Sequence, residues 1–499
     1  MGISLNPSTI LSGQGIDVSS VVSQIISKQS GQLTVWEGQQ TTFATQDGLL
    51  EGMENNLTNL QTAVAALADP TGPLAAQAAT SSDTGVLTAT AQNTAIAGTH
   101  EIVVSSLATT GTLYTNPIAA GANTSFLSSG QTTGDLKLRV GGGSGTIDDI
   151  PITQGSNDTL TTLASYINTQ STANDWGVTA SVVSDTSGSR LSLQSQNSGS
   201  AGALAIVNNS NTTLTFATPE GGANAALTID GVPFSSSTNT VTGAIQGVTL
   251  NLAGLSAGTP PSEVVQLTVG PDQNQITSAV NNFVSAYNTL VSTIDTQYVV
   301  DPTGATPAPP LLGDLSLSSL QSSMLNDAGY AVPIAGWPNL LGDPSETINL
   351  ASLGINMNND GTLTLALAPT KTGPSFAQAL AADPTGVVSF FQNSSGTGFA
   401  NNFNTDLTNL TNPTSGPLNV DLAQNQAEDS DLTTTIANFQ AQLATETTAL
   451  TSQYDAVNAS LQQYPLLLQA TTEVLGTLGS GTSDTGQTIS SEPTLTSGL

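Results

Sequence analysis

The chain has no cysteine and very few basic residues, and both absences narrow the classes of protein to which it can belong. Without cysteine it can form neither a disulfide framework nor a thiolate metal site. Lysine and arginine together number 5 against 36 acidic residues, which gives a formal net charge of −31. Because so few cations cannot neutralise a run of phosphates, we expect neither nucleic-acid binding nor attraction to anionic lipid. The five cations are scattered: Lys28, Lys137, Arg139, Arg190 and Lys371.

Aromatic residues and long apolar runs are also scarce. Aromatic residues make up 4% of the chain and charged residues only 8%, so we expect a surface made mostly of Thr, Ser, Asn, Gln and Gly. An uncharged polar surface with an acidic bias suits an extracellular protein that must stay soluble. No window approaches the ~20 apolar residues of a membrane span, so we expect no membrane insertion. Residues 1–6 lack a basic region and a continuous apolar stretch, and we expect no cleaved secretory signal.

The sequence offers little for catalysis or metal binding. A glycosidase would need two carboxylates in one cleft at roughly 5–10 Å, and the few aromatic residues do not predict a sugar-binding groove. His100, the only histidine, has no cysteine or second histidine to complete a zinc site or a triad. The glycines of 141–145 lack the ending of a phosphate loop, and Asp148, Asp149 and the acids of 428–431 lack calcium-loop spacing. We expect no enzyme activity, no metal and no cofactor.

What the sequence does contain is the same apolar seam near each end. In both regions apolar residues follow an a/d heptad pattern. The N-terminal seam consists of Val22, Ile25, Trp36, Phe43, Leu50, Met53, Leu57, Leu60, Val64 and Leu67. The C-terminal seam consists of Leu432, Ile436, Phe439, Leu443 and Leu450, continued by Val457. Each exposed Leu or Ile forgoes roughly 1.5–3 kcal/mol of burial, so the seams must pair with each other, with copies of the chain or with another protein.

Between the two seams the hydrophobic period changes from helical to alternating. We predict a helix from Asp17 to Ala68, with Asp17 or Ser19 as N-cap. Because this helix contains several glycines, we expect breaks or disorder before about Trp36 when the segment has no partner. A second long helix is predicted from about Leu418 to Leu461, with an unstructured tail beyond Leu478. Strands are predicted at 86–90, 101–105, 136–140, 178–183, 190–194, 226–229, 248–252 and 267–269.

Three local features complete the pattern. Asp230-Gly231 is a turn signal, and we place it between a strand pair formed by 226–229 and 248–252. A short helix through 160–167 is predicted with Asn157 or Asp158 as its cap. Apolar residues again follow a helical spacing at 276–294 and 315–325, where we predict helices. A β-hairpin is predicted near 355–365.

Several of these segments, in this order and spacing, resemble the flagellar filament cap family, hook-associated protein 2 (FliD family). Residues 15–26, Gly-Ile-Asp-Val-Ser-Ser-Val-Val-Ser-Gln-Ile-Ile, are similar to its N-terminal signature. Residues 80–99 resemble the first strands of its plate domain, and 159–193 resemble a module inserted in flagellins and hook-associated proteins. Residues 352–363 and 381–384 are similar to its C-terminal half.

The resemblance implies an α+β fold: a helical, coiled-coil-like leg domain formed by both chain ends, with nested, mainly β plate domains inserted between them. The implied domains are a flexible N-terminal helical segment at 1–40, the leg at 41–77 plus 271–455 with the hairpin near 355–365, a β plate at 78–131 plus 208–270, an inserted β-rich domain at 132–207, and a C-terminal helical segment with a disordered tail at 456–499.

The resemblance also implies a function without covalent chemistry. Members form a homo-oligomeric ring at the distal tip of the filament and promote the folding and insertion of exported flagellin. The implied partners are other copies of the chain, flagellin, the hook–filament junction protein and a cytoplasmic export chaperone at the C-terminal segment. Secretion would follow the flagellar type III route. The alternative functions are another flagellar axial protein (flagellin or junction protein) or a cell-surface adhesin.

Two roles are predicted for the seam residues. Those at the outer ends are expected to contact other subunits or flagellin: Val18, Val22, Ile25, Trp36, Phe43, Val457, Leu461, Leu466 and Leu467. Those nearer the middle are expected to hold the leg helices together: Leu50, Met53, Leu57, Leu60, Val64, Leu67, Leu432, Ile436, Phe439, Leu443 and Leu450. The alternative is that both seams pack entirely within one monomer. Because basic residues are so few, we expect apolar and neutral hydrogen-bonded interfaces rather than salt bridges.

Overall fold

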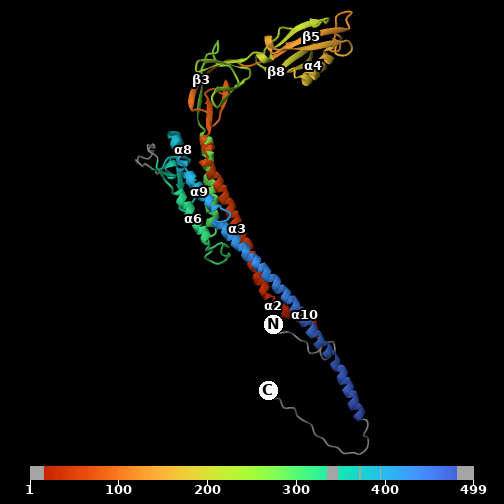
Figure 1. The fold of residues 1–499 in the computed structure, drawn as a ribbon, viewed down its shortest axis with the longest axis vertical. Helices are drawn as coiled ribbons and strands as arrows, with labels where there is room; N and C mark the ends of the chain where they lie inside the picture. Colours follow the sequence, from red (N-terminus) through yellow and green to blue (C-terminus); the bar gives the residue numbers. More distant parts are fainter. Residues whose placement is uncertain (1–15, 334–346, 370–372, 394, 480–499) are drawn as a thin grey trace, which may run out of the picture. The chain divides into compact units, whose positions relative to one another are not determined.

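The computed structural model describes residues 16–333, 347–369, 373–393 and 395–479 (Figure 1). The chain forms two compact units. Unit 1 contains Met1–Thr58, Thr289–Met324 and Leu407–Leu499, and unit 2 contains Asn59–Asn288 and Leu325–Asp406. The expected α+β fold, with helices at both ends and β domains between them, is confirmed. The finer division into five domains stays a prediction.

The helices and strands follow the predicted order. The helices are α2 (Val18–Gln29), α3 (Gly31–Ala68), α4 (Leu160–Asn174), α5 (Gln273–Asp295), α6 (Leu315–Ala328), α7 (Phe376–Ala382), α8 (Pro384–Phe391), α9 (Phe399–Leu410) and α10 (Pro417–Gly479). The strands are β1 (Gln77–Ser81), β2 (Leu87–Ala91), β3 (Gly98–Ser106), β4 (Thr110–Tyr114), β5 (Thr133–Val140), β6 (Thr146–Thr153), β7 (Val178–Asp185), β8 (Gly188–Ser198), β9 (Leu204–Ser210), β10 (Ala225–Ile229), β11 (Val232–Ser236), β12 (Thr240–Ile245), β13 (Val248–Leu252), β14 (Val265–Pro271), β15 (Val332–Pro333), β16 (Thr347–Ile348), β17 (Ile355–Met357) and β18 (Leu363–Leu365).

The N-terminal helix begins where the sequence predicts. The Asp17 carboxylate caps α2 by accepting a hydrogen bond from the backbone N–H of Ser20. The helix has a break before Trp36, at Ser30 between α2 and α3, and the expectation for a segment without a partner stays a prediction. The other glycines of this region lie inside the unbroken helix α3, because the buried apolar face of that helix outweighs their low helix propensity.

The C-terminal helix is longer than predicted. It was expected to end near Leu461, but α10 continues through Pro465 to Gly479. Proline removes one backbone hydrogen bond, yet the leucines and glutamines around it are strong helix formers that carry the helix on. The predicted tail beyond this point lies outside the described residues.

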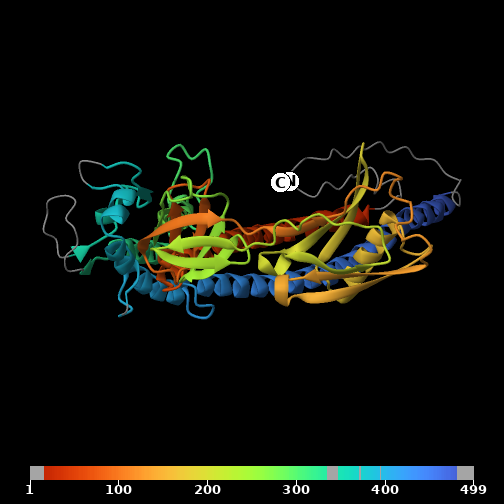
Figure 2. The ribbon, with the colours of Figure 1, turned by 90° about the horizontal axis from the view of Figure 1, so that it is seen from above.

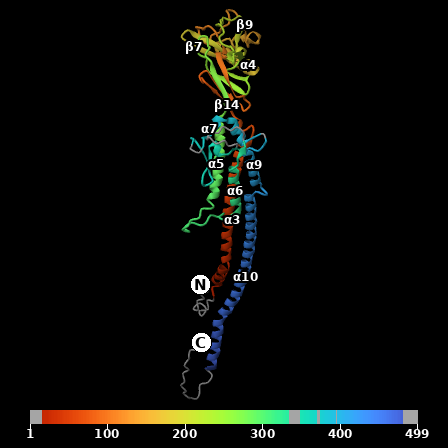
Figure 3. The same cartoon turned by 90° about the vertical axis from the view of Figure 1, so that its left-hand side faces the viewer.

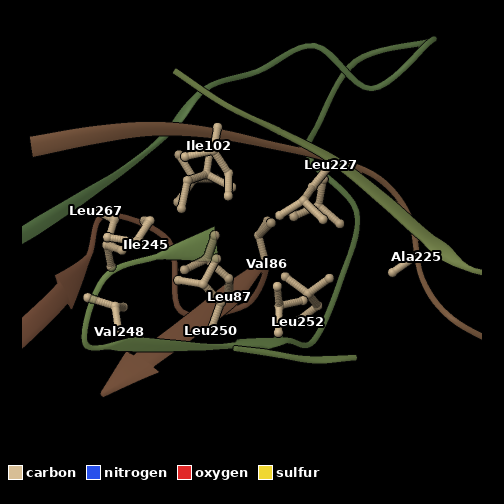
Figure 4. Packing of buried hydrophobic residues seen from close by; sticks show 14 of the residues in the cluster. Val86, Leu87, Ile102, Ala225, Leu227, Ile245, Val248, Leu250, Leu252 and Leu267 are labelled. Atoms are coloured by element: carbon tan, nitrogen blue, oxygen red, sulfur yellow. The ribbon is translucent and has the colours of Figure 1, made fainter. Parts of the chain in front are cut away.

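Two sheets of unit 2 pack face to face as a β-sandwich. One sheet has the order β1-β14-β3-β10-β11 and the other has the order β12-β13-β2. Figure 4 shows Ile102 and Leu227 of the first sheet facing Leu87, Leu250 and Leu252 of the second. All five side chains are buried, as expected for the inner faces of two packed sheets.

The predicted pairing around Asp230 was wrong. The Asp230-Gly231 turn joins β10 to β11, whereas β13 pairs with β12 and β2 in the other sheet. Both turn residues have positive φ, at 52° and 79°, which suits a tight two-residue hairpin between adjacent strands. The error arose because the short strand at 232–236 contains a proline and exposes most of its side chains, so its hydrophobic pattern is weak.

A second β domain within unit 2 lies between β4 and β9 and contains α4. Its sheets have the orders β4-β8-β7 and β6-β5-β9, and α4 packs on them through Leu160, Leu163 and Ile167. The predicted caps of α4 were wrong, since Thr159 is the N-cap and forms a capping box with Thr162. Asn157 and Asp158 are instead buried in the preceding turn, where their side chains bind backbone groups.

The remainder of unit 2 is built around an aromatic cluster and a short hairpin. Phe283 and Tyr287 of α5 pack against Phe399 and Phe403 of α9 at centroid distances of 5.7 to 6.5 Å. The predicted hairpin near 355–365 is confirmed as β17 and β18. The Asn288 side chain holds it by exchanging two hydrogen bonds with the backbone of Leu363, at 2.6 and 2.7 Å.

Candidate functional site

The terminal helices of unit 1 run antiparallel to each other. In Figures 2 and 3 the red ribbon of α2 and α3 lies beside the blue ribbon of α10. The Gln29 amide donates to Glu446 at 2.8 Å, the Gln40 amide donates to Thr433 at 2.7 Å, and Glu54 accepts from Asn419 at 3.1 Å. As the residue number rises along α2 and α3, the number of the contacted residue on α10 falls by nearly the same amount. The pairing therefore has one register across the break at Ser30.

The apolar seam lies between these polar contacts. Leu50, Met53 and Leu57 are at most 1% exposed, and Ile436 and Leu443 are 8% and 7% exposed. Leu432, Phe439 and Leu450 are half-buried. The remaining seam residues predicted from the sequence, Leu60, Val64 and Leu67, belong to unit 2 and are fully buried there. The heptad pattern thus marks the side chains that face inward.

The predicted interface residues fall into two groups. Val18 and Val22 are buried in the α2–α10 pair, Trp36 packs against Phe439, and Ile25 and Phe43 are half-buried. The residues near the end of α10 differ: Leu461 is half-buried, whereas Val457, Leu466 and Leu467 are 48%, 65% and 63% exposed. Of these two groups of predicted residues, the second contains the large apolar side chains that are exposed.

Four further apolar side chains of α10 join this second group. They are Tyr464, Leu468, Val474 and Leu475, with exposed fractions between 55% and 71%. Tyr464 follows Val457 by seven residues, Leu475 follows Leu468 by seven and Val474 follows Leu467 by seven, and this spacing could have identified them had the helix not been ended at Leu461. We call Val457, Leu461 and the exposed apolar residues from Tyr464 to Leu475 the α10 tip.

The α10 tip is apolar on two faces. Val457, Leu461, Tyr464, Leu468 and Leu475 follow steps of four, three, four and seven residues, so they lie on one face of the helix. Leu467 and Val474, seven residues apart, lie on another face of the helix. A helix that is apolar on more than one face is normally buried on more than one side, so one partner helix would leave part of this surface exposed.

Two carboxyl groups, those of Asp314 and Asp421, line a pocket near the helix pair. This pocket, of about 280 Å³ in unit 1, is lined by Gln46, Asp314, Ser316, Asp421 and neighbouring side chains. Burial raises the pKa of Asp421, the Ser316 hydroxyl opposes this by hydrogen bonding, and the charge of Asp314 adds to the rise. In the three hydrogen bonds described above, a neutral amide group donates to a hydroxyl or carboxylate oxygen.

The described residues also bear on metal binding and membrane insertion. No group of three or more His, Cys, Asp or Glu side chains in these ranges is placed to hold a metal ion. No helix in the described part of the chain is long and apolar enough to cross a membrane.

The terminal helices pair in unit 1, the β domains are inserted between them in the sequence, and the described end of α10 exposes apolar side chains, an arrangement that suits a component of an assembly. Comparison with known proteins names that assembly. The family models for the N- and C-terminal regions of flagellar hook-associated protein 2 match residues 14–111 and 222–465. The flagellin hook IN motif matches residues 135–197. The chain belongs to the hook-associated protein 2 family, the filament cap proteins of bacterial flagella.

Individual relatives agree with this assignment. The B-type flagellar hook-associated protein 2 of Pseudomonas aeruginosa is 29% identical over 474 residues, covering 88% of this chain and 93% of its own length. Flagellar hook-associated protein 2 of Escherichia coli is 26% identical over 377 residues, covering 71% and 74%. The crystal structure of the D1-D2-D3 domains of the flagellar cap protein FliD from Escherichia coli matches with a TM-score of 0.50 at 24% identity, covering 76% of this chain and 99% of that chain. The structural match supports the fold.

Proposed function

We propose that copies of this chain assemble through the α10 tip into a closed ring that caps the flagellar filament. The ring acts without covalent chemistry: it holds exported flagellin while it folds and inserts, and prevents its loss. The chain reaches the filament tip through the flagellar type III export route. The observation that carries the proposal is the exposed apolar surface of the α10 tip.

Energetics support a partner at this surface. Each large apolar side chain left in water forgoes roughly 1.5–3 kcal/mol of burial. Six residues of the α10 tip, Tyr464, Leu466, Leu467, Leu468, Val474 and Leu475, are more than half exposed. Exposed apolar residues gathered along two faces of one helix are typical of a protein–protein contact surface. Ring formation would bury both faces at once, because each subunit in a ring has two neighbours.

The partners follow from the same chemistry. With 36 acidic residues and five basic ones, copies of the chain can form few mutual salt bridges, and we infer contacts made of apolar groups and neutral hydrogen bonds. Flagellin would be received by the ring. The hook–filament junction protein would lie below the cap before the filament grows, and an export chaperone would cover the C-terminal segment in the cytoplasm. Val18, Val22, Ile25, Trp36 and Phe43 would then support the interface from within the helix pair.

The mass of the full-length protein at several concentrations tests the assembly. We expect an oligomer that dissociates when residues before Thr42 and after Tyr454 are removed. A sharper variant combines Leu467→Ser with Val474→Ser, which replaces two apolar side chains of α10 that are 63% and 57% exposed. Gln469→Ser, an exposed position on the same helix, is the matched control and should keep the oligomer. An unchanged mass for the double variant would contradict assembly through the α10 tip.

A deletion strain tests the cap function separately. Without the gene, cells should secrete flagellin monomers but assemble no filaments. The wild-type gene and the Gln469→Ser variant should restore filaments, whereas the double variant should not. Short or absent hooks in the deletion strain would instead favour another axial role.

A further inference from the structure

Unit 2 contains a buried carboxyl pair whose chemistry the capping function does not use. Asp327, at the end of α6, is 6% exposed, and its Oδ2 atom is buried without a proton donor. The side chain within hydrogen-bonding reach is another carboxyl group, that of Asp406 on α9. Tyr287 of α5 lies close enough to sense the charge of Asp327, is itself fully buried, and its hydroxyl also has no partner.

These groups belong to three helices that contain no lysine, arginine or histidine. Among the described residues, the titratable groups that interact with Asp327 are Asp406 from α9 and the Tyr287 phenol from α5. Tyr330, which follows α6, directs its hydroxyl to the carbonyl of Thr397 at 3.4 Å. No cation within these helices can compensate two negative charges.

Asp327 is buried and Asp406 is half-buried, and joint ionisation of two carboxyl groups in contact is disfavoured there because each charge raises the energy of the other. Burial raises the pKa of Asp327 to about 8, and the hydrogen bond to Asp406 and its charge add to this rise. Burial and the nearby Asp327 also raise the pKa of Tyr287, so its phenol stays neutral. A hydrogen bond between two carboxyl groups exists only while one of them carries a proton.

We propose that Asp327 and Asp406 share one proton, and that this proton fastens the C-terminal end of α6 to α9. The pair then works as a pH-sensitive latch within unit 2. In acidic or neutral surroundings the shared proton keeps the helix ends together around the aromatic cluster. In alkaline surroundings the proton is lost, two like charges face each other, and these helix ends open more often. The inference concerns unit 2 alone and does not depend on ring assembly.

The direction of the pH effect follows from linkage. An unfolded aspartate has a pKa near ~3.9, so between about pH 4 and pH 8 the folded protein holds one proton that the open form releases. Opening therefore becomes about tenfold more favourable for each pH unit in this window. Above about pH 8 both forms have lost the proton, and the dependence levels off.

Hydrogen exchange measured by mass spectrometry on the full chain tests the latch. Protection factors for peptides from α6 and α9, corrected for the intrinsic exchange rate, should fall about tenfold per unit from pH 5 to pH 7 and level off near pH 8. Asp327→Asn keeps the shape and supplies an amide donor for Asp406. The protection factors of this variant should equal those of the wild type at pH 5, should no longer fall as pH rises, and should exceed those of the wild type at pH 9. Asp406→Asn is the second variant and should flatten the profile in the same way.

The matched control is Asp431→Asn, which removes an exposed carboxylate from α10 and should keep the wild-type slope. Three results would overturn the proposal: a flat wild-type profile between pH 5 and pH 8, an unchanged slope in both asparagine variants, or equal loss of slope in the control. Calcium chloride at pH 9 distinguishes a proton from a metal ion. Strong protection of these peptides by calcium would show that the pair holds a cation instead.

Discussion

The indole ring of Trp36 meets the phenyl ring of Phe439 edge to face, with centroids 5.3 Å apart and ring planes at 85°. These two residues are far apart in sequence and lie on antiparallel helices of unit 1. The contact lies between the hydrogen bonds of Gln29 and Gln40 to α10, so it shares their register. Trp36 lies in the first part of α3, which also contains Gly31, Gly38 and Gly48.

A double-mutant cycle on these rings should reveal a favourable coupling. Edge-to-face pairs contribute about 0.5–1.5 kcal/mol beyond the burial of their surface. We expect Trp36→Ala and Phe439→Ala each to destabilise the helix pair, and the double variant to lose less than the sum. Urea unfolding followed by circular dichroism measures this. Strict additivity of the two losses would show that the rings do not interact in solution.

Replacing glycines of α3 by alanine should stabilise the protein. A methyl group at Gly38, Gly48 or Gly52 would meet nothing within 4 Å, so only helix propensity changes. Each substitution should add about 0.5–1 kcal/mol to the free energy of unfolding. Thermal unfolding should show the increase for each variant. Gly202→Ala is the contrasting variant and should destabilise, because its Cβ would lie 1.9 Å from the carbonyl oxygen of Asn197.

Removing the hydroxyl of Thr159 should weaken the inserted β domain. Thr159 caps α4 by accepting from the backbone N–H of Thr162, and the Thr162 side chain returns a bond to the Thr159 backbone. Thr159→Ala should cost about 1 kcal/mol, whereas Thr159→Ser should retain most of the stability. Denaturant unfolding of both variants provides the comparison. Equal losses would indicate that packing of the threonine methyl, rather than capping, is what matters.

The contact between His100 and Asp230 should make the β-sandwich sensitive to acid. His100 Nδ1 lies 2.7 Å from Asp230 Oδ2, and this contact, with the backbone N–H of Glu101, lowers the pKa of Asp230. The stabilisation is therefore present above the usual carboxyl pKa of ~3.9 and is lost as pH falls through the lowered value. Because Asp230 is half exposed, Asp230→Asn should cost at most ~1 kcal/mol at pH 7.

Thermal unfolding between pH 2 and pH 7 measures this effect. In the Asp230→Asn variant, the unfolding temperature should fall less between pH 4 and pH 2 than it does in the wild type. Asp175→Asn is the matched control, since Asp175 is also an exposed aspartate with positive φ, at 54°. A control that flattens the curve as much as Asp230→Asn would assign the acid sensitivity to other carboxylates.

Local signals in the sequence were sufficient where a single segment decides its own structure. The Asp17 cap, the helical period of α5 and the Asn-Asp-Gly turn between β17 and β18 are set by neighbours within a few residues. The heptad spacing likewise identified the buried seam, because a helix faces inward wherever its apolar residues recur. The five cations among 499 residues already favoured neutral contacts between helices.

Only the tertiary structure decided which distant segments meet. It placed Asp230 between β10 and β11, since strand pairing depends on the register of the whole sandwich rather than on the turn alone. It divided the predicted interface residues into a buried set along α2 and α3 and an exposed set at the α10 tip, because a heptad pattern does not state its partner. It also brought Asp327 to Asp406 across 79 residues, where burial rather than sequence determines which group keeps a proton.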